Sequence, residues 1–120
     1  AAAQVRQRVG ENMMIGVSAH TVEEARRAVA HGADCLGVGA VFPTSSKSDV
    51  GEMSYETLKA ICKAVSIPVV AIGGISGENV GKLAGSGICG VAVISAIYAA
   101  KDVKAAAADL KSTVEEMLRV

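Results

Sequence analysis

The sequence has very few aromatic residues: no tryptophan, one phenylalanine and two tyrosines, together 2% of the chain. Without aromatic side chains there is no platform on which nucleic-acid bases could stack. Neither sign of charge is in excess, because twelve basic residues balance twelve acidic ones. A nucleic-acid partner usually requires a basic face, and the sequence contains no basic run. We therefore expect no nucleic-acid partner.

Long apolar runs and paired cysteines are missing as well. The longest apolar run, at 91–100, is interrupted by Ser95, so it is shorter than the ~18 residues that a membrane helix needs. The three cysteines, Cys35, Cys62 and Cys89, form no C-x-x-C pair and no metal-binding framework with the histidines. We expect buried thiols in a reducing, cytoplasmic protein that has no metal site of its own and does not bind a membrane.

What the sequence does contain is a large aliphatic fraction, since 51% of its 120 residues are hydrophobic. This is enough for one core, so residues 1–120 are expected to form a single domain. Short apolar runs alternate with segments of helical spacing. The runs are continuous rather than alternating in polarity, which is typical of parallel strands buried on both faces. The predicted strands lie at 13–17, 35–38, 69–72 and 89–94.

Helix-start signals fall between these strands. The predicted helices begin at Thr21, with Glu24 completing a capping box, at Ser54, at Ser76 and near Asp102. Residues 18–39 also align with residues 73–94, which indicates an internal repeat of two βα units. Four βα units in a row give an α/β fold with right-handed crossovers. The repeat favours half of a closed (β/α)₈ TIM barrel, and an open doubly wound sheet is the alternative.

The carboxyl ends of the predicted strands carry glycines, hydroxyls, a histidine and a lysine, but no carboxylate. In barrels and open sheets alike, the functional site lies at this edge. The Gly73-Gly74 turn and Ser95, which begins a short helix, are both suited to binding phosphate. The loop 44–47, Thr-Ser-Ser-Lys, adds three hydroxyls and one ammonium group. Without a carboxylate pair or a lysine inside a strand, glycosidase and Schiff-base chemistry are disfavoured.

Three further polar residues lie near strand ends. His20 follows the first strand. It either acts as a catalytic acid or base, or has a structural role at the end of the strand. His31 precedes a helix-ending glycine, and Asp34 precedes the second strand, so we expect both to have structural roles.

Four strings together resemble the thiamine-phosphate synthase (thiamine-phosphate pyrophosphorylase) family over almost the whole chain, in matching order and spacing. They are GVSAHT at 16–21, GVGAVFPTSSKSD at 37–49, AIGGI at 71–75 and VAVISAI at 91–97. The resemblance implies that the chain is the C-terminal half of a (β/α)₈ barrel. It also implies a transferase that couples hydroxymethylpyrimidine diphosphate to thiazole phosphate, giving thiamine phosphate and pyrophosphate with Mg²⁺.

The resemblance also implies which residues act. Ser18 and Lys47 would bind the leaving pyrophosphate and are the implied catalytic residues. The thiazole phosphate would be held by three loop hydroxyls and by backbone groups of the last two strand ends: Thr44, Ser45, Ser46, Gly74, Ile94 and Ser95. The family usually has threonine at the position of Ser46. Its magnesium aspartates come earlier in its sequence, so we expect no Mg²⁺ ligand here and no activity from this chain alone.

Two alternatives stay open. One is a thiazole tautomerase, a related barrel that would use His20 as acid or base. The other is a non-catalytic half-barrel that binds phosphate or pairs with a second subunit. Self-association of half-barrels is expected in the absence of the other half.

Overall fold

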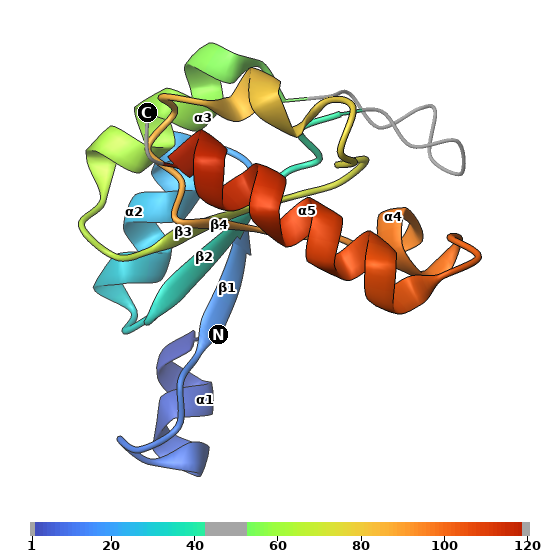
Figure 1. Cartoon of the computed structure of the whole chain (residues 1–120). Helices are drawn as coiled ribbons and strands as arrows, with labels where there is room; N and C mark the ends of the chain where they lie inside the picture. The colour runs from blue at the N-terminus through green and yellow to red at the C-terminus, as the bar shows by residue number, and fades with distance from the viewer. Residues whose placement is uncertain (1, 43–52, 119–120) are drawn as a thin grey trace.

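The computed structural model describes residues 2–42 and 53–118 of the 120-residue chain. Its four strands form one parallel sheet in the order β1-β2-β3-β4, so each strand pairs with the next one along the chain. The strands are β1 (Gly16–Ala19), β2 (Cys35–Val38), β3 (Val69–Ile72) and β4 (Gly90–Ala92) (Figure 1). This order has no reversal point, unlike a doubly wound sheet, and confirms the predicted succession of βα units.

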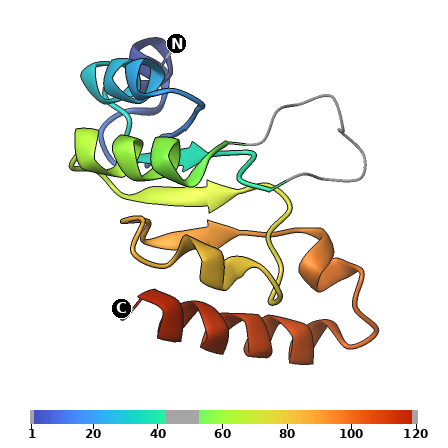
Figure 2. The same ribbon diagram turned by 90° about the horizontal axis from the view of Figure 1, so that it is seen from above.

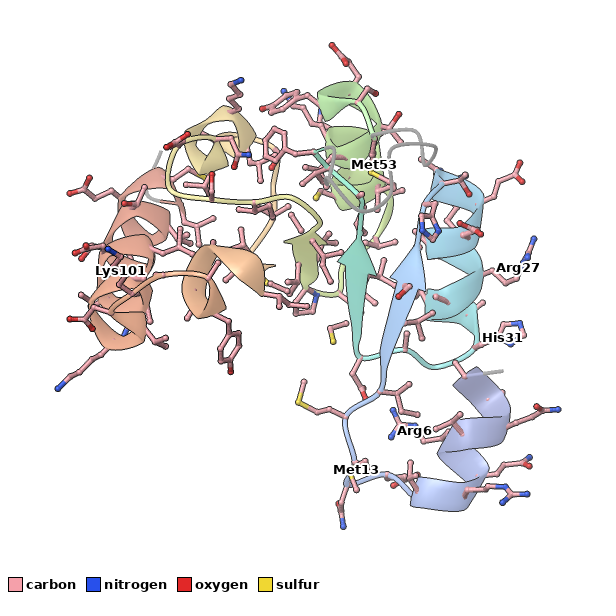
Figure 3. The ribbon with its side chains drawn as sticks, turned by 90° about the vertical axis from the view of Figure 1, so that its right-hand side faces the viewer. Arg6, Met13, Arg27, His31, Met53 and Lys101 are labelled. Atoms are coloured by element: carbon pink, nitrogen blue, oxygen red, sulfur yellow. The ribbon has the colours of Figure 1, made fainter. Side chains whose placement is uncertain are left out.

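The helices that connect the strands gather on one side of the sheet. In Figure 3, α2, α3, η1 and α5 form an arc around the sheet, from α2 on the right to α5 on the left. Figure 2 shows α5 running alongside β4. This one-sided cover is the arrangement of half a TIM barrel. The helical elements are α1 (Ala2–Val9), α2 (Val22–Ala30), α3 (Tyr55–Ala64), the 3₁₀ turn η1 (Val80–Leu83), α4 (Ser95–Tyr98) and α5 (Val103–Leu118).

The two faces of the sheet differ in burial. Because side chains alternate along a strand, the register places Ser18, Gly37 and Val70 in one row on the same face. Ser18 is exposed and the other two are half-buried. The opposite, helix-covered face carries the core, in which Leu36, Val38, Val69 and Ala71 are at most 2% exposed.

Two of the predicted helix starts are confirmed by their capping bonds. The hydroxyl of Thr21 accepts a hydrogen bond from the Glu24 N–H at 3.0 Å, and the hydroxyl of Ser54 accepts one from the Thr57 N–H at 3.1 Å. The Glu24 carboxylate accepts from the His20 N–H at 2.8 Å. This backbone hydrogen bond lowers the pKa of Glu24.

The first predicted strand is wrong in its position. The strand begins at Gly16, and Met13 and Met14 are 56% and 75% exposed. Residues before Gly16 are instead tied to other parts of the chain. The Arg6 guanidinium donates to the Met13 carbonyl at 2.6 Å, and the Asp34 carboxylate accepts from the Ile15 N–H at 2.8 Å. The apolar run at 13–15 is therefore a loop between α1 and β1, because side chains form the hydrogen bonds of its backbone groups.

The helix predicted from Ser76 is also wrong, because only the 3₁₀ turn η1 forms there. The Asn79 side chain accepts a hydrogen bond from the Ser76 N–H at 2.8 Å and holds the preceding turn. Glycines at positive φ follow η1, at Gly85 (+77°) and Gly87 (+100°). The two copies of the sequence repeat thus differ: one holds the α-helix α2 and the other only η1. The fourth strand is also shorter than predicted, ending at Ala92.

The cysteines correct a further expectation. Cys35 and Cys62 are half-buried, but Cys89 is exposed, and all three are free thiols. Burial raises the pKa of the Cys62 thiol, with a smaller contribution from Cys89. None of the helices at 2–42 and 53–118 is long and apolar enough to cross a membrane.

Candidate functional site

All four strands end at the same edge of the sheet, because all of them are parallel, and in Figure 2 the arrowheads of β2, β3 and β4 point the same way. The residues that follow them are His20 after β1, Gly39 after β2, Gly73 after β3 and Val93 after β4. In α/β folds this edge carries the functional site. The loops there can differ in length and sequence, while the strands hold the ends of each loop in place.

Three of the predicted site residues follow the ends of the adjacent strands β3 and β4. Ile72 at the end of β3 pairs with Ala92 at the end of β4, so Gly74 and Ile94 each come two residues after one of two paired strand ends. Ser95 then begins α4, whose first turn is closed by the Tyr98 N–H donating to the Ile94 carbonyl at 2.9 Å. The first N–H groups of a helix have no intrahelical acceptor, so the backbone here offers donors.

The loop after β2 packs tightly against the end of β3. The N–H groups of Val41 and Phe42 donate to the carbonyls of Ile72 and Gly73 at 3.1 and 3.2 Å. Gly73 has a φ of +100°, and a Cβ there would lie 2.7 Å from the Ala40 Cα. Only glycine allows this approach, so the Gly-Gly turn is required by the packing as well as by its own conformation.

Ser18 lies in β1, two strands away from β3. It is exposed in β1, and the register aligns it through Gly37 with Val70, four residues before Gly74. Two strand spacings of ~4.8 Å separate β1 from β3, so Ser18 is roughly 10 Å from β3 across the sheet. Ser18 therefore belongs to a different part of the strand-end surface.

Four predicted site residues, Thr44, Ser45, Ser46 and Lys47, lie outside the described residues. The residues that flank them are placed beside the end of β2, because the Met53 N–H donates to the Ala40 carbonyl at 2.7 Å.

His20 lies at the surface, where 64% of its side chain is exposed. Its Nδ1 atom is 3.4 Å from the Glu24 Oε1 atom, and its N–H donates to the same oxygen. These contacts favour the structural interpretation of His20 over an acid or base role.

The other two polar residues lie at the opposite edge. His31 is the C-cap of α2, and its N–H donates to the carbonyls of Arg27 and Ala28. Asp34, just before β2, accepts from the Ile15 N–H and pairs with Arg6 at 2.6 Å. The Ile15 N–H first, and the Arg6 guanidinium second, hold the pKa of the Asp34 carboxyl below its ordinary value. Both residues thus have contacts that support structural roles.

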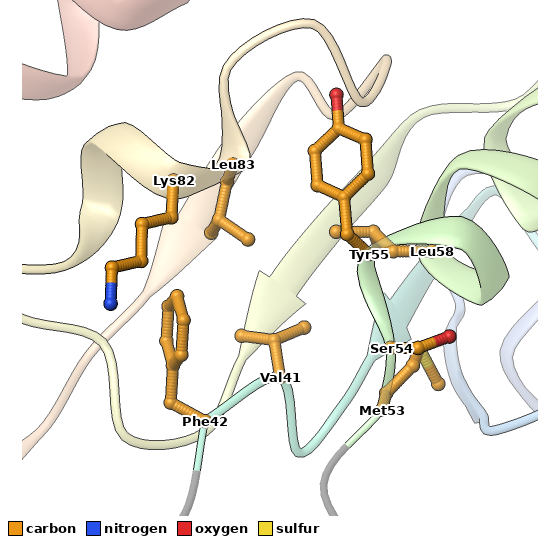
Figure 4. Close-up of a pocket in the computed structure, with 8 residues that line it drawn as sticks. All are labelled: Val41, Phe42, Met53, Ser54, Tyr55, Leu58, Lys82 and Leu83. Carbon is orange, nitrogen blue, oxygen red and sulfur yellow. The ribbon is translucent and has the colours of Figure 1, made fainter.

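A cavity of about 370 Å³ lies between the start of α3 and η1 (Figure 4). None of the predicted site residues that the structure describes lines it. Its wall is apolar apart from Ser54, Tyr55 and Lys82, and the Tyr55 hydroxyl donates to the Ala84 carbonyl at 2.7 Å. No signal in the sequence marks this cavity, because it is formed by segments that are far apart in the chain. The residues that line it are Val41, Phe42, Met53, Ser54, Tyr55, Leu58, Lys82 and Leu83.

A family model described as "Thiamine monophosphate synthase" matches residues 1–97. The chain belongs to this family. Among curated relatives, the thiamine-phosphate synthase of Clostridium tetani is 53% identical over 112 residues, and that of Pyrococcus abyssi is 48% identical over 115 residues. These alignments take in 93% and 96% of this chain but only 54% and 56% of the relatives. The chain thus spans about half the length of the curated thiamine-phosphate synthases it matches.

Solved structures agree with this assignment. A thiamine phosphate pyrophosphorylase from Pyrococcus furiosus is 42% identical and superposes with a TM-score of 0.89, covering 98% of this chain and 56% of that one. A chain described as "Native KDPGal structure" superposes with a TM-score of 0.72 at 26% identity, covering 57% of that chain. The four strands are therefore half of the TIM-barrel-like fold of a thiamine-phosphate synthase.

The resemblance to the thiamine-phosphate synthase family implies Mg²⁺, which would need a group of oxygen ligands from the protein. Within residues 2–42 and 53–118, no group of three or more His, Cys, Asp or Glu side chains could hold a metal ion. The described residues therefore do not fit a magnesium centre, and no step below is derived through one.

Proposed function

We propose that this chain is the C-terminal, phosphate-binding half of a thiamine-phosphate synthase, and that residues 1–120 form one domain of it. The reaction would join hydroxymethylpyrimidine diphosphate to thiazole phosphate, releasing pyrophosphate. One observation carries the proposal: a chain of this family presents a strand-end edge of glycines, hydroxyls and backbone N–H groups. Such groups suit phosphorylated substrates.

The thiazole phosphate would bind at the ends of β3 and β4. Gly74, Ile94 and Ser95 come from adjacent strand ends and offer backbone groups, which is where TIM barrels commonly bind phosphate. In this proposal the hydroxyls of Thr44, Ser45 and Ser46 complete the contacts.

The leaving pyrophosphate would be neutralised by Ser18 and Lys47. It departs from a benzylic-type carbon, the electron-rich pyrimidine ring stabilises the resulting cation, and the thiazole nitrogen attacks that carbon. No protein nucleophile is needed, so the protein must align two substrates and stabilise the departing charge. The position of Ser18 in β1, two strands away from β3, supports two separate anion subsites. Mg²⁺, when bound by the complete enzyme, would supply further positive charge.

The test of this function is Lys47→Ala in a complete enzyme that carries this segment, assayed for pyrophosphate release. Losing a charge-assisted contact to the leaving group should lower kcat about 10²- to 10³-fold. Lys82→Ala is the matched control, because Lys82 lines the cavity beside η1 and should leave turnover within about twofold of the parent. Near-normal turnover of Lys47→Ala would reject the role of Lys47.

Ser95→Ala tests the second subsite. Because the backbone donors of α4 are retained, the substitution should raise the KM for thiazole phosphate more than it lowers kcat. An unchanged KM would remove the Ser95 hydroxyl from the phosphate contacts.

The tautomerase and the non-catalytic half-barrel predict different results. Isomerisation of the thiazole substrate without pyrophosphate release, abolished by His20→Ala, would support the tautomerase. Binding of sulfate by the complete protein without either reaction would support the non-catalytic alternative.

A further inference from the structure

The side chain of Asn79 bridges the turn that follows β3. Its Oδ1 atom accepts from the Ser76 N–H, and its Nδ2 atom donates to the Gly74 carbonyl, both at 2.8 Å. Asn79 itself is half-buried and stands between two anchored neighbours, since Ile75 is 4% exposed and Val80 is fully buried. The bridge is therefore held on the core and does not depend on a free loop.

The backbone groups of this turn are used unequally. Three successive carbonyls are hydrogen-bonded: Ile72 by the Val41 N–H, Gly73 by the Phe42 N–H and Gly74 by the Asn79 side chain. By contrast, the N–H groups of Gly74 and Ile75 donate to no residue in the described ranges 2–42 and 53–118. Among the residues that the structure describes, the turn thus has its acceptors occupied and its donors without a partner.

The geometry of a trans peptide connects these two facts. The C=O and the following N–H of one planar peptide point in opposite directions, so fixing the carbonyl also fixes the direction of the N–H. The Phe42 N–H holds the Gly73 carbonyl and so orients the Gly74 N–H. Asn79 holds the Gly74 carbonyl and so orients the Ile75 N–H.

We propose that Asn79 is a positioning residue of the phosphate subsite, which aims the Ile75 N–H at the thiazole phosphate by anchoring the Gly74 carbonyl. This proposal rests on the proposed function, since it assumes that the end of β3 binds phosphate. It requires a side chain that donates and accepts at once over this span, as an amide does. A carboxylate or a hydroxyl at position 79 could accept from the Ser76 N–H but could not hold the Gly74 carbonyl in the same way.

The experiment is steady-state kinetics on a complete synthase that contains this segment, with Asn79→Ala compared with Glu78→Ala. Glu78 is the exposed neighbour of Asn79 and serves as the control. We expect Asn79→Ala to raise the KM for thiazole phosphate about 10-fold or more, because hydrogen bonds to charged groups are among the stronger ones. The kcat should change less than about threefold, and the KM for the pyrimidine diphosphate should stay unchanged, because that substrate is assigned to the Ser18 and Lys47 subsite.

Asn79→Ser covers the case in which the alanine variant fails to fold. Its hydroxyl can still accept from the Ser76 N–H, as serine does in turns, but it is too short to reach the Gly74 carbonyl. The serine variant should therefore fold and show the same selective rise in the KM for thiazole phosphate.

A fall in kcat with both KM values unchanged would mean that Asn79 only stabilises the fold, and would overturn the proposal. If the parent enzyme couples the two substrates but neither variant alters any KM, the inference fails while the proposed function stands. A parent that does not couple them at all overturns both.

Discussion

At the scale of single residues, two glycines set how closely the loop after β2 approaches the end of β3. A Cβ on Gly39 would clash with the Ile72 carbonyl oxygen, and one on Gly73 would meet Ala40. These contacts are with backbone atoms, which cannot rotate away as the end of a flexible side chain can. The strand-end surface therefore depends on small residues for its shape before any ligand is considered.

Gly73→Ala should destabilise the protein by about 1–3 kcal/mol, because it adds a backbone clash to an unfavourable φ of +100°. Gly77→Ala is the matched control: it lies in the same turn region, but an added Cβ would meet nothing within 4 Å. The free energy of unfolding from urea titrations would measure both. Equal stability of the two variants would contradict the packing argument.

Asp34 makes the stability depend on pH. Its pKa is lowered in the folded protein, so its contribution is fully present above the ordinary carboxyl pKa of about 3.9 and is lost as the pH falls towards the lowered value. We expect Asp34→Asn to be less stable than the parent near neutral pH, and this difference to shrink below about pH 4.

Thermal unfolding measured across that pH range would test the expectation. Glu116→Gln, at an exposed position in α5, should show no such pH-dependent difference. A gap between Asp34→Asn and the parent that is constant with pH would mean that the Ile15 and Arg6 contacts do not depend on the charge of Asp34.

At the scale of elements, the start of α3 is fixed by one hydroxyl. Ser54 accepts from the Thr57 N–H, and α3 buries Leu58 and Ile61 against the sheet. Ser54→Ala should cost about 1 kcal/mol of stability, the usual effect of losing an N-cap. Ser112→Ala, inside α5 and exposed, should be neutral within about 0.5 kcal/mol. Chemical denaturation of both variants would show whether the cap has this effect.

The elements that could be predicted from the sequence are those governed by local rules. The strands at 35–38 and 69–72 have the predicted bounds, because each is a continuous apolar run between turn signals. The errors at 13–17 and after Ser76 have a common cause. In both places a side chain, Arg6 or Asn79, satisfies the backbone across several residues and replaces the regular hydrogen bonds.

The same distinction applies to the candidate site. That Gly74 and Ile94 follow adjacent strand ends is a consequence of parallel strands in chain order, so it could be predicted. The bridge made by Asn79 could not, because an asparagine three residues after Ser76 also suits a helix start. The cavity beside η1 could not be predicted either, since residues from distant segments line it, among them Phe42, Leu58 and Lys82.

At the scale of the whole molecule, the sheet has two edge strands, β1 and β4, neither of which has a second neighbour in the described part of the chain. Large apolar side chains near the ends of β3 and β4 are exposed: Ile72 by 43%, Ile94 by 73% and Tyr98 by 75%. Unpaired edges and exposed apolar side chains favour association with another chain.

We expect the 120-residue chain alone to self-associate or aggregate and to release no measurable pyrophosphate. Two copies could pair β4 of one with β1 of the other, because all strands in a closed barrel are parallel. Sedimentation velocity, with and without a separately expressed remainder of the enzyme, would measure this. Adding the remainder should reduce self-association and restore some turnover. A monodisperse monomer with full activity would show that the chain is not half of an enzyme.

The order of the strands has a consequence for folding during synthesis. Every strand pairs with the one made just before it, and the paired residues are close in sequence: Gly16 and Cys35 are 19 residues apart, and Leu36 and Val69 are 33 apart. The entropy cost of loop closure differs between these two pairings by only about 0.5 kcal/mol. Within these four strands, each new strand finds its partner already made, so this part of the sheet can grow at its newest edge while the ribosome is still adding residues.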